Sequence, residues 1–195
     1  MEQNSHPDVE KSAIESQIRE CFGRVVYTTK THEKDADLCM QWLGRVKLAQ
    51  IVLSALTTGG LVTVLIGEPQ TSQIAAIVSA VISTALLILN AYIKDVDPGQ
   101  QAEQHKKTAT ELWNIRESYL SLLADLRAAD VDMHLVRKKR DDLQTELADI
   151  YSSAPRTTPK AYKYAGQGLK LREEMTFSDD EIDKLLPVTL RKEAN

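Results

Sequence analysis

The sequence predicts an all-α membrane protein in which a two-span transmembrane helical hairpin lies between long N- and C-terminal cytoplasmic helices. Two apolar runs, residues 48–67 and 74–93, are each long enough to cross a hydrocarbon core of about 30 Å at about 1.5 Å per residue. Glu68 is the only charged residue between Leu48 and Ile93, although charged residues are plentiful on both sides. The segment that joins the runs, LIGEPQTSQI, contains a glycine and a proline and therefore predicts a turn.

Charge and helix-breaking residues divide the chain into four segments. Both apolar runs contain Ser, Thr, Gly, Gln or Asn residues that offset much of the gain from Leu, Ile and Val, so we expect the two spans to insert together. The four segments are an N-terminal cytoplasmic helix over 1–45, the transmembrane hairpin over 46–94, a cytoplasmic helical region over 95–152, and a Pro-containing tail with a short helix over 153–195.

The N-terminal segment carries a helical pattern from Val9 to Trp42. Ser12 followed by Glu15 predicts a capping box at its start, whereas Gly23 and the nearby threonines weaken its middle. Apolar and small residues recur in steps of three and four, which lines one face of a helix. They are Ile14, Ile18, Cys21, Val25, Thr28, His32, Ala36, Cys39 and Leu43.

The charges that flank the spans predict their orientation. Basic residues lie outside both ends of the hairpin, and the connecting loop has no Lys or Arg, so both termini are expected in the cytoplasm. Trp42 and Tyr92 fall at the same predicted face of the membrane, where aromatic rings prefer to lie. The flanking basic residues are Arg45, Lys47, Lys94, Lys106 and Lys107.

A long helical region follows the hairpin. Pro98 and Gly99 predict a turn, and apolar residues then recur in steps of three and four, with a break expected near Asp130. We favour packing of this face against the N-terminal helix over an intermolecular coiled coil. Pro155 and Pro159 then predict an extended crossing. A short helix is expected after Ser178, which has Glu181 three residues on, and Tyr162, Tyr164 and Leu169 are expected to pack back on the helices.

Small and weakly polar residues form a stripe on each span. At 100° per residue, Gln50, Ser54 and Thr57 share one narrow face of the first span. The second stripe comprises Ser72, Ala75, Ala76, Ser79, Ser83 and Asn90. Such a stripe either packs helices together in lipid or lines a water-filled path in an oligomer, and the absence of a ring of charge favours packing.

Composition argues against several classes of protein. The net charge of −4 gives no electrostatic basis for nucleic-acid binding. Cys21 and Cys39 are expected to stay reduced, because eighteen residues of one helix separate them by about 27 Å, and neither belongs to a metal-binding pattern. No catalytic motif is present, so we expect no cofactor and no enzyme. A soluble four-helix bundle is the alternative fold, but two charge-free helices would lack enough cover.

The order of these segments resembles the SLATT family, the SMODS and SLOG-associating two-transmembrane effector domains. The resemblance rests on three stretches and the closing EIDKLLP: VVYTTKTHEKDADLCMQW, AYIKDVDPGQQAEQHKKTATELWNIRESYLSLLADLRA and SAPRTTPKAY. Within these stretches, a candidate cytoplasmic regulatory face comprises His32, His105, Lys106, Arg116 and Tyr119.

The resemblance implies a membrane effector of a bacterial anti-phage or conflict system. Such a protein would lie in the inner membrane, assemble as a homo-oligomer in the lipid bilayer, and form a pore or disrupt the membrane when triggered. The trigger would come from a separately encoded nucleotide-second-messenger synthase, sensor or reverse transcriptase. A membrane-anchored scaffold that recruits a partner through residues 101–150 is the alternative function. The hairpin stripes are then candidate pore-lining or packing residues: Gln50, Ser54, Thr57, Ser79, Ser83 and Asn90.

Overall fold

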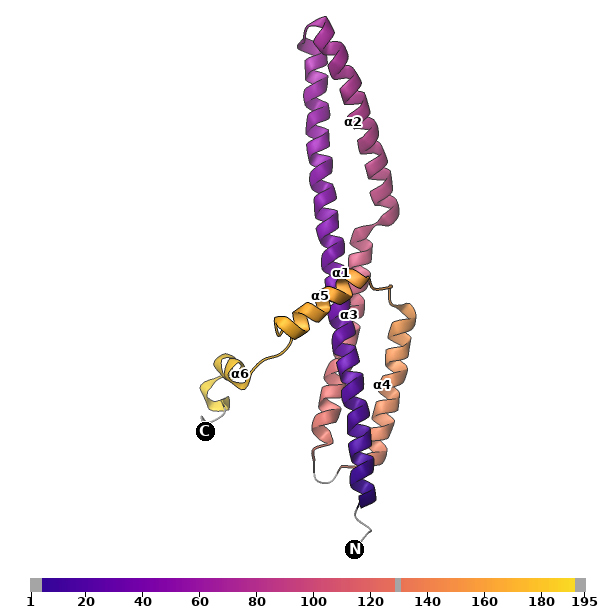
Figure 1. Cartoon of the computed structure of the whole chain (residues 1–195), viewed down its shortest axis with the longest axis vertical. Helices are drawn as coiled ribbons and strands as arrows, with labels where there is room; N and C mark the ends of the chain where they lie inside the picture. Colours follow the sequence, from indigo (N-terminus) through magenta and orange to yellow (C-terminus); the bar gives the residue numbers. More distant parts are fainter. Residues whose placement is uncertain (1–4, 129–130, 192–195) are drawn as a thin grey trace. The chain divides into compact units, whose positions relative to one another are not determined.

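The computed structural model describes residues 5–128 and 131–191, and over these residues it is entirely helical, without a strand (Figure 1). The chain forms two compact units. One, here called the core unit, comprises the chain up to Lys34 and from Thr108 onward, and the other, the apolar unit, comprises Asp35–Lys107. The helices are α1 (Ser5–Ile66), α2 (Pro69–Val96), α3 (Pro98–Asp125), α4 (Met133–Ser153), α5 (Pro159–Leu171), α6 (Asp179–Leu185) and the 3-10 helix η1 (Val188–Leu190).

The core unit is built around apolar faces of α1, α3 and α4. The three- and four-residue spacing places Ile14, Ile18, Cys21 and Val25 of α1 in the interior, where Ile18 and Val25 are completely buried. The predicted packing of the post-hairpin region against the N-terminal helix is therefore confirmed. The residues that α3 and α4 contribute to this core are Leu112, Ile115, Tyr119, Leu122, Leu126, Val136, Leu143 and Ile150.

Helix α1 is continuous through the segment in which the sequence predicted a weak middle. The prediction of a start at Ser12 is wrong, because α1 already includes Ser5, and Gly23 does not interrupt it. The hydroxyls of Thr28, Thr29 and Thr31 each donate a 2.8 Å hydrogen bond to the carbonyl oxygen four residues earlier. These bonds satisfy the hydroxyls within the helix, so the threonines need no break in it.

The breaks between the later helices have local causes. Asp97, in the left-handed region at φ 38°, ends α2, and its Oδ1 accepts a hydrogen bond from the backbone N–H of Gln100. Pro98 opens α3 because it lacks the N–H that would continue α2. The break expected near Asp130 lies between the end of α3 and the start of α4, whereas Ala129 and Asp130 themselves lie outside the described residues.

The tail departs from the prediction in one respect: helix α5 occupies most of the segment for which an extended crossing was expected, and the extended part is limited to residues 154–158. Thr158 caps α5 by accepting the backbone N–H of Ala161, and Ser178 and Glu181 form the predicted capping box of α6. The prediction that Tyr162, Tyr164 and Leu169 pack inward is only partly right. Tyr162 and Tyr164 remain 59% and 39% exposed, although the Tyr162 ring lies 4.8 Å from that of Tyr27. The fully buried face of α5 consists of its small residues Ala161, Ala165 and Gly168.

The core can be tested by truncating one completely buried side chain. We expect Leu112→Ala to lower the free energy of unfolding by about 2–5 kcal/mol, because it removes buried methyl groups and leaves a cavity. Leu120, on the same helix but 45% exposed, provides the matched control. Thermal denaturation of the detergent-solubilised chain measures both, and equal losses for Leu112→Ala and Leu120→Ala would contradict this account of the core.

Candidate functional site

The apolar unit presents a large apolar surface. Its two long apolar helices satisfy the length and composition of membrane spans, yet their most apolar 18-residue stretches are only 0% and 6% buried. A core helix of a soluble protein would have most of such a stretch covered. The exposed large side chains between residues 48 and 92 are Leu48, Ile51, Val52, Leu56, Leu61, Val62, Leu65, Ile66, Ile74, Ile77, Val78, Val81, Leu87, Ile88 and Tyr92.

Polar and small side chains lie where α1 and α2 contact each other. The Gln50 amide donates to the Asn90 side-chain oxygen at 2.6 Å. Farther along, Ser79 is 4% exposed and faces Gly60, where an added Cβ would lie 2.1 Å from the Ser79 hydroxyl. The rings of Trp42 and Tyr92 meet edge-on, with centroids 6.2 Å apart. Close backbone approach and side-chain hydrogen bonds are the means by which helices associate in lipid.

The structure divides the predicted stripe residues by the contacts that they make. Gln50 and Asn90 bond to each other, Ser79 is buried, and half-buried Thr57 donates its hydroxyl to the Leu53 carbonyl oxygen at 3.0 Å. Ser54 and Ser83 are exposed, as is Asn90. A single 100° periodicity could not separate these two groups, because the separation depends on the direction from which the second helix approaches.

The turn between α1 and α2 is closed by local contacts. Gly67 donates its N–H to the Thr63 carbonyl oxygen at 2.9 Å, and a Cβ at Gly67 would lie 2.5 Å from that oxygen. The Ser72 hydroxyl donates to the Gly67 carbonyl oxygen at 3.1 Å. Pro69 then occupies the first turn of α2, where its missing N–H has no helical partner to lose. The glycine and the proline that predicted this turn are thus explained: Gly67 has no room for a side chain beside the Thr63 carbonyl oxygen, and Pro69 fits the start of α2.

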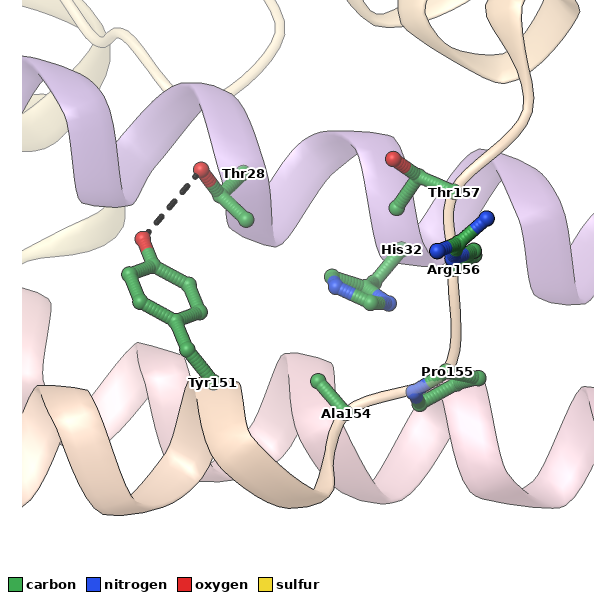
Figure 2. Close-up of a pocket in the computed structure, with 7 residues that line it drawn as sticks. All are labelled: Thr28, His32, Tyr151, Ala154, Pro155, Arg156 and Thr157. Carbon is green, nitrogen blue, oxygen red and sulfur yellow. Dashed lines mark hydrogen bonds between the residues drawn. The ribbon is translucent and has the colours of Figure 1, made fainter.

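The core unit contains an open hollow of about 380 Å³ between α1, the end of α4 and the connector to α5 (Figure 2). Its lining residues are Thr28, His32, Tyr151, Ala154, Pro155, Arg156 and Thr157. The Tyr151 hydroxyl lies 3.5 Å from that of Thr28, and His32, only 2% exposed, lies between this pair and the connector. Sequence reasoning singled out His32 but did not associate it with the connector.

The five residues of the predicted regulatory face belong to both units. His105 and Lys106 belong to the apolar unit, and the other three belong to the core unit. Tyr119 is completely buried, and burial together with the nearby Cys21 raises its pKa to about 12. Tyr119 thus belongs to the apolar core of the core unit.

The remaining members of that predicted face have different surroundings. The Arg116 guanidinium lies 4.4 Å from the Trp113 ring centroid and donates to the Glu117 carboxylate at 2.8 Å. His105 is 5% exposed, and burial lowers its pKa while the Asp35 carboxylate opposes that shift. Lys106 is exposed.

A cluster that sequence reasoning missed joins α1 to the segment after α5. The Glu174 carboxylate accepts from Lys30 Nζ at 2.8 Å and Lys34 Nζ at 3.0 Å, and we call these three residues the lysine clasp. Hydrogen bonds from both lysines lower the pKa of Glu174 to about 2. The residues on either side, Glu173 and Met175, have φ of 52° and 74°, which L-residues seldom adopt. Lys34 and Glu174 are 140 residues apart, so no local sequence pattern could predict this cluster.

Residues 14–181 match the family described as SMODS and SLOG-associating 2TM effector domain family 4. The chain belongs to this SLATT family. The resemblance predicted from the sequence is thereby confirmed, and the match includes residues of both units. Neither the curated proteins nor the solved structures gave a match. The two apolar helices of this SLATT protein agree with the two-transmembrane description of its family.

The contact between α1 and α2 can be tested at adjacent glycines of this SLATT chain. We expect Gly60→Val to lower the free energy of unfolding by about 1–3 kcal/mol more than Gly59→Val, because the new side chain at 60 collides with Ser79. Nothing lies within 4 Å of a Cβ at Gly59, so that variant reports the change in helix propensity alone. Denaturant titration in detergent measures the difference, and equal effects would exclude this close approach.

The lysine clasp predicts a pH-dependent attachment of the tail. The pKa of Glu174 is lower in the folded protein than its ordinary value of 4.5, so its stabilising contribution is complete above that value and is lost as the pH falls toward about 2. At pH 7 we expect Glu174→Gln to increase hydrogen exchange in α5 relative to wild type. The difference should disappear as the pH is lowered through this range.

The neighbouring Glu173→Gln is the control for this experiment, because it keeps the same left-handed backbone position and Glu173 is exposed. Mass spectrometry measures the exchange rates of the wild type and the two variants, with labelling times corrected for the effect of pH on intrinsic exchange. If Glu173→Gln increases hydrogen exchange in α5 as much as Glu174→Gln does, the increase comes from a change in the bend and not from loss of the lysine clasp.

Proposed function

We propose that this protein is a membrane effector of a bacterial defence system, whose two apolar helices insert as a hairpin into the inner membrane with both termini in the cytoplasm. The apolar surface of α1 and α2, almost none of it buried, is the observation that carries this proposal. Lipid would cover that surface, and the helical backbone would satisfy its own hydrogen bonds there. The proposal assigns no catalytic step.

The absence of basic residues at the tip supports the orientation. Gly67 and Glu68 join the helices, Lys94 lies in the last turn of α2, and Arg45 and Lys47 precede the apolar part of α1. Basic residues are retained on the cytoplasmic side of bacterial membranes. The loop would therefore be the part that crosses the membrane.

We further propose that several copies assemble and that their hairpins form a pore or a membrane lesion. A single helix pair encloses no channel, so permeation requires an oligomer. The exposed hydroxyl residues Ser54 and Ser83 support this step, because they lie outside the contact that holds α1 and α2 together. They are available to contact another copy or to face water. A separately encoded nucleotide-second-messenger synthase, sensor or reverse transcriptase would supply the trigger.

A membrane-anchored scaffold is the second candidate function. Its support is that the core unit has its own apolar interior, formed by α1, α3 and α4, and could present a partner-binding surface without help from the spans. In that case the apolar helices would only anchor the chain. Replacing residues 48–93 with an unrelated two-span hairpin would then preserve function, whereas the pore requires the native spans.

A single substitution in α2 tests the pore. We expect Ser83→Leu to leave membrane insertion intact but to abolish depolarisation after phage challenge, because it replaces an exposed hydroxyl with an apolar side chain. Ser83 is a cleaner position than Ser79, whose enlargement would also disturb the contact with Gly60. The control is Ile88→Leu, an apolar exchange at a residue of α2 that is 64% exposed.

Depolarisation is measured with a potential-sensitive dye in cells that carry the neighbouring genes, and insertion by carbonate-resistant membrane fractionation. Depolarisation by Ser83→Leu at the wild-type level would exclude a role for this residue in the lesion. Effective defence with an unchanged membrane potential in wild-type cells would exclude the pore itself and favour the scaffold.

A further inference from the structure

The hollow in the core unit is lined by hydrogen-bond donors and by one arginine. His32 lies at its base, Arg156 and Thr157 border it from the connector, and Tyr151 borders it from the last turn of α4 (Figure 2). Among the lining residues that the structure describes, the ionisable groups are an imidazole, a guanidinium and a phenol, and none is a carboxylate. The hollow therefore gathers hydrogen-bond donors and one permanent positive charge.

Local backbone geometry brings these groups together. Thr28 and His32 are four residues apart on α1, so they lie one turn apart on the same face. Helix α4 ends at Ser153, and Ala154 then adopts an extended conformation, with φ −68° and ψ 139°. Two prolines, Pro155 and Pro159, keep the connector from continuing the helix. The extended connector thus carries Arg156 to the part of the hollow that His32 occupies.

The walls of the hollow also offer an apolar surface. The Tyr151 side chain is 41% exposed and half-buried Pro155 lies on the connector, next to Ala154. Binding sites for small molecules combine mainly apolar walls with a few placed polar groups and have volumes of about 300–1,000 Å³. The volume of about 380 Å³ falls within that range.

We propose that this hollow binds a small organic phosphate. The Arg156 guanidinium would donate to the phosphate oxygens, and the hydroxyls of Thr157 and Tyr151 would add further donors, while Thr28 and His32 form the wall that α1 contributes. A tetrahedral phosphate suits donors that approach from α4 and the connector, and Arg matches its oxygens with two parallel N–H groups. The organic part would lie against the ring of Tyr151 and against Pro155.

Occupancy would join α1 to the connector between α4 and α5 through one ligand. The connector leads into α5, whose buried face packs within the core unit. Bound phosphate would therefore hold the connector in its extended conformation. The binding site stands on the geometry of the core unit alone and does not depend on the membrane role, so direct binding measurements test it separately from toxicity.

Phenyl phosphate is a suitable probe, because it combines a phosphate monoester with one flat ring. Isothermal titration of the full chain in detergent should detect binding, and Arg156→Gln should weaken it about tenfold by removing a charge-assisted, two-point contact. Tyr151→Phe should weaken binding several-fold while preserving the ring. Both positions are exposed enough that neither change is expected to unfold the chain. Arg172→Gln, an exposed arginine at the end of α5 and outside the hollow, is the control and should bind as wild type does.

Two further ligands separate the contribution of the phosphate from that of the ring. Benzoate keeps the ring but replaces phosphate with a planar carboxylate, and inorganic phosphate keeps the anion but lacks the ring. Weaker binding of both would support the proposal. Absence of phenyl phosphate binding, equal binding of benzoate, or unchanged affinity in Arg156→Gln would overturn it.

Discussion

Helix α1 is the element on which both units depend, because one uninterrupted helix from Ser5 to Ile66 supplies a packing face to each. Its N-terminal part buries Ile18 and Val25 in an apolar core, and its C-terminal part approaches α2 closely at Gly60. Threonine hydroxyls of α1 donate to carbonyl oxygens one turn earlier, so they are satisfied without a break in the helix. The helix is thus continuous although the side chains of its two ends lie in different surroundings.

The two units have opposite relations to water. In the core unit, apolar side chains are inside and charged side chains such as Arg140 pair at the surface, so burial of apolar area stabilises it in the ordinary way. In the apolar unit the large side chains are outside, and polar groups such as Gln50 and Asn90 contact each other. This reversal is the physical reason why α1 and α2 agree with the two-transmembrane description of the family.

The tail is held to α1 by specific polar contacts rather than by a large apolar face. Small residues of α5 permit close packing, and the carboxylate of Glu174 reaches two lysines from a bend in which its two neighbours occupy left-handed backbone positions. Tyr27 and Tyr162 add a ring contact beside this attachment. The same part of the chain, through the connector at Arg156, completes the hollow.

The helical class, the apolar runs, the turn at Pro69, the cap at Ser178 and the family could be predicted, because all of these depend on short-range spacing and composition, whereas α5 was missed. Packing between segments decides which positions of a stripe meet another helix: Ser79 is buried whereas Ser83 is exposed, although both belong to one predicted face. It also placed Tyr119 in the core and joined Lys30 to Glu174. A helical period fixes the relative directions of side chains along one helix, but the partner that each direction meets is set by packing between segments far apart in the chain.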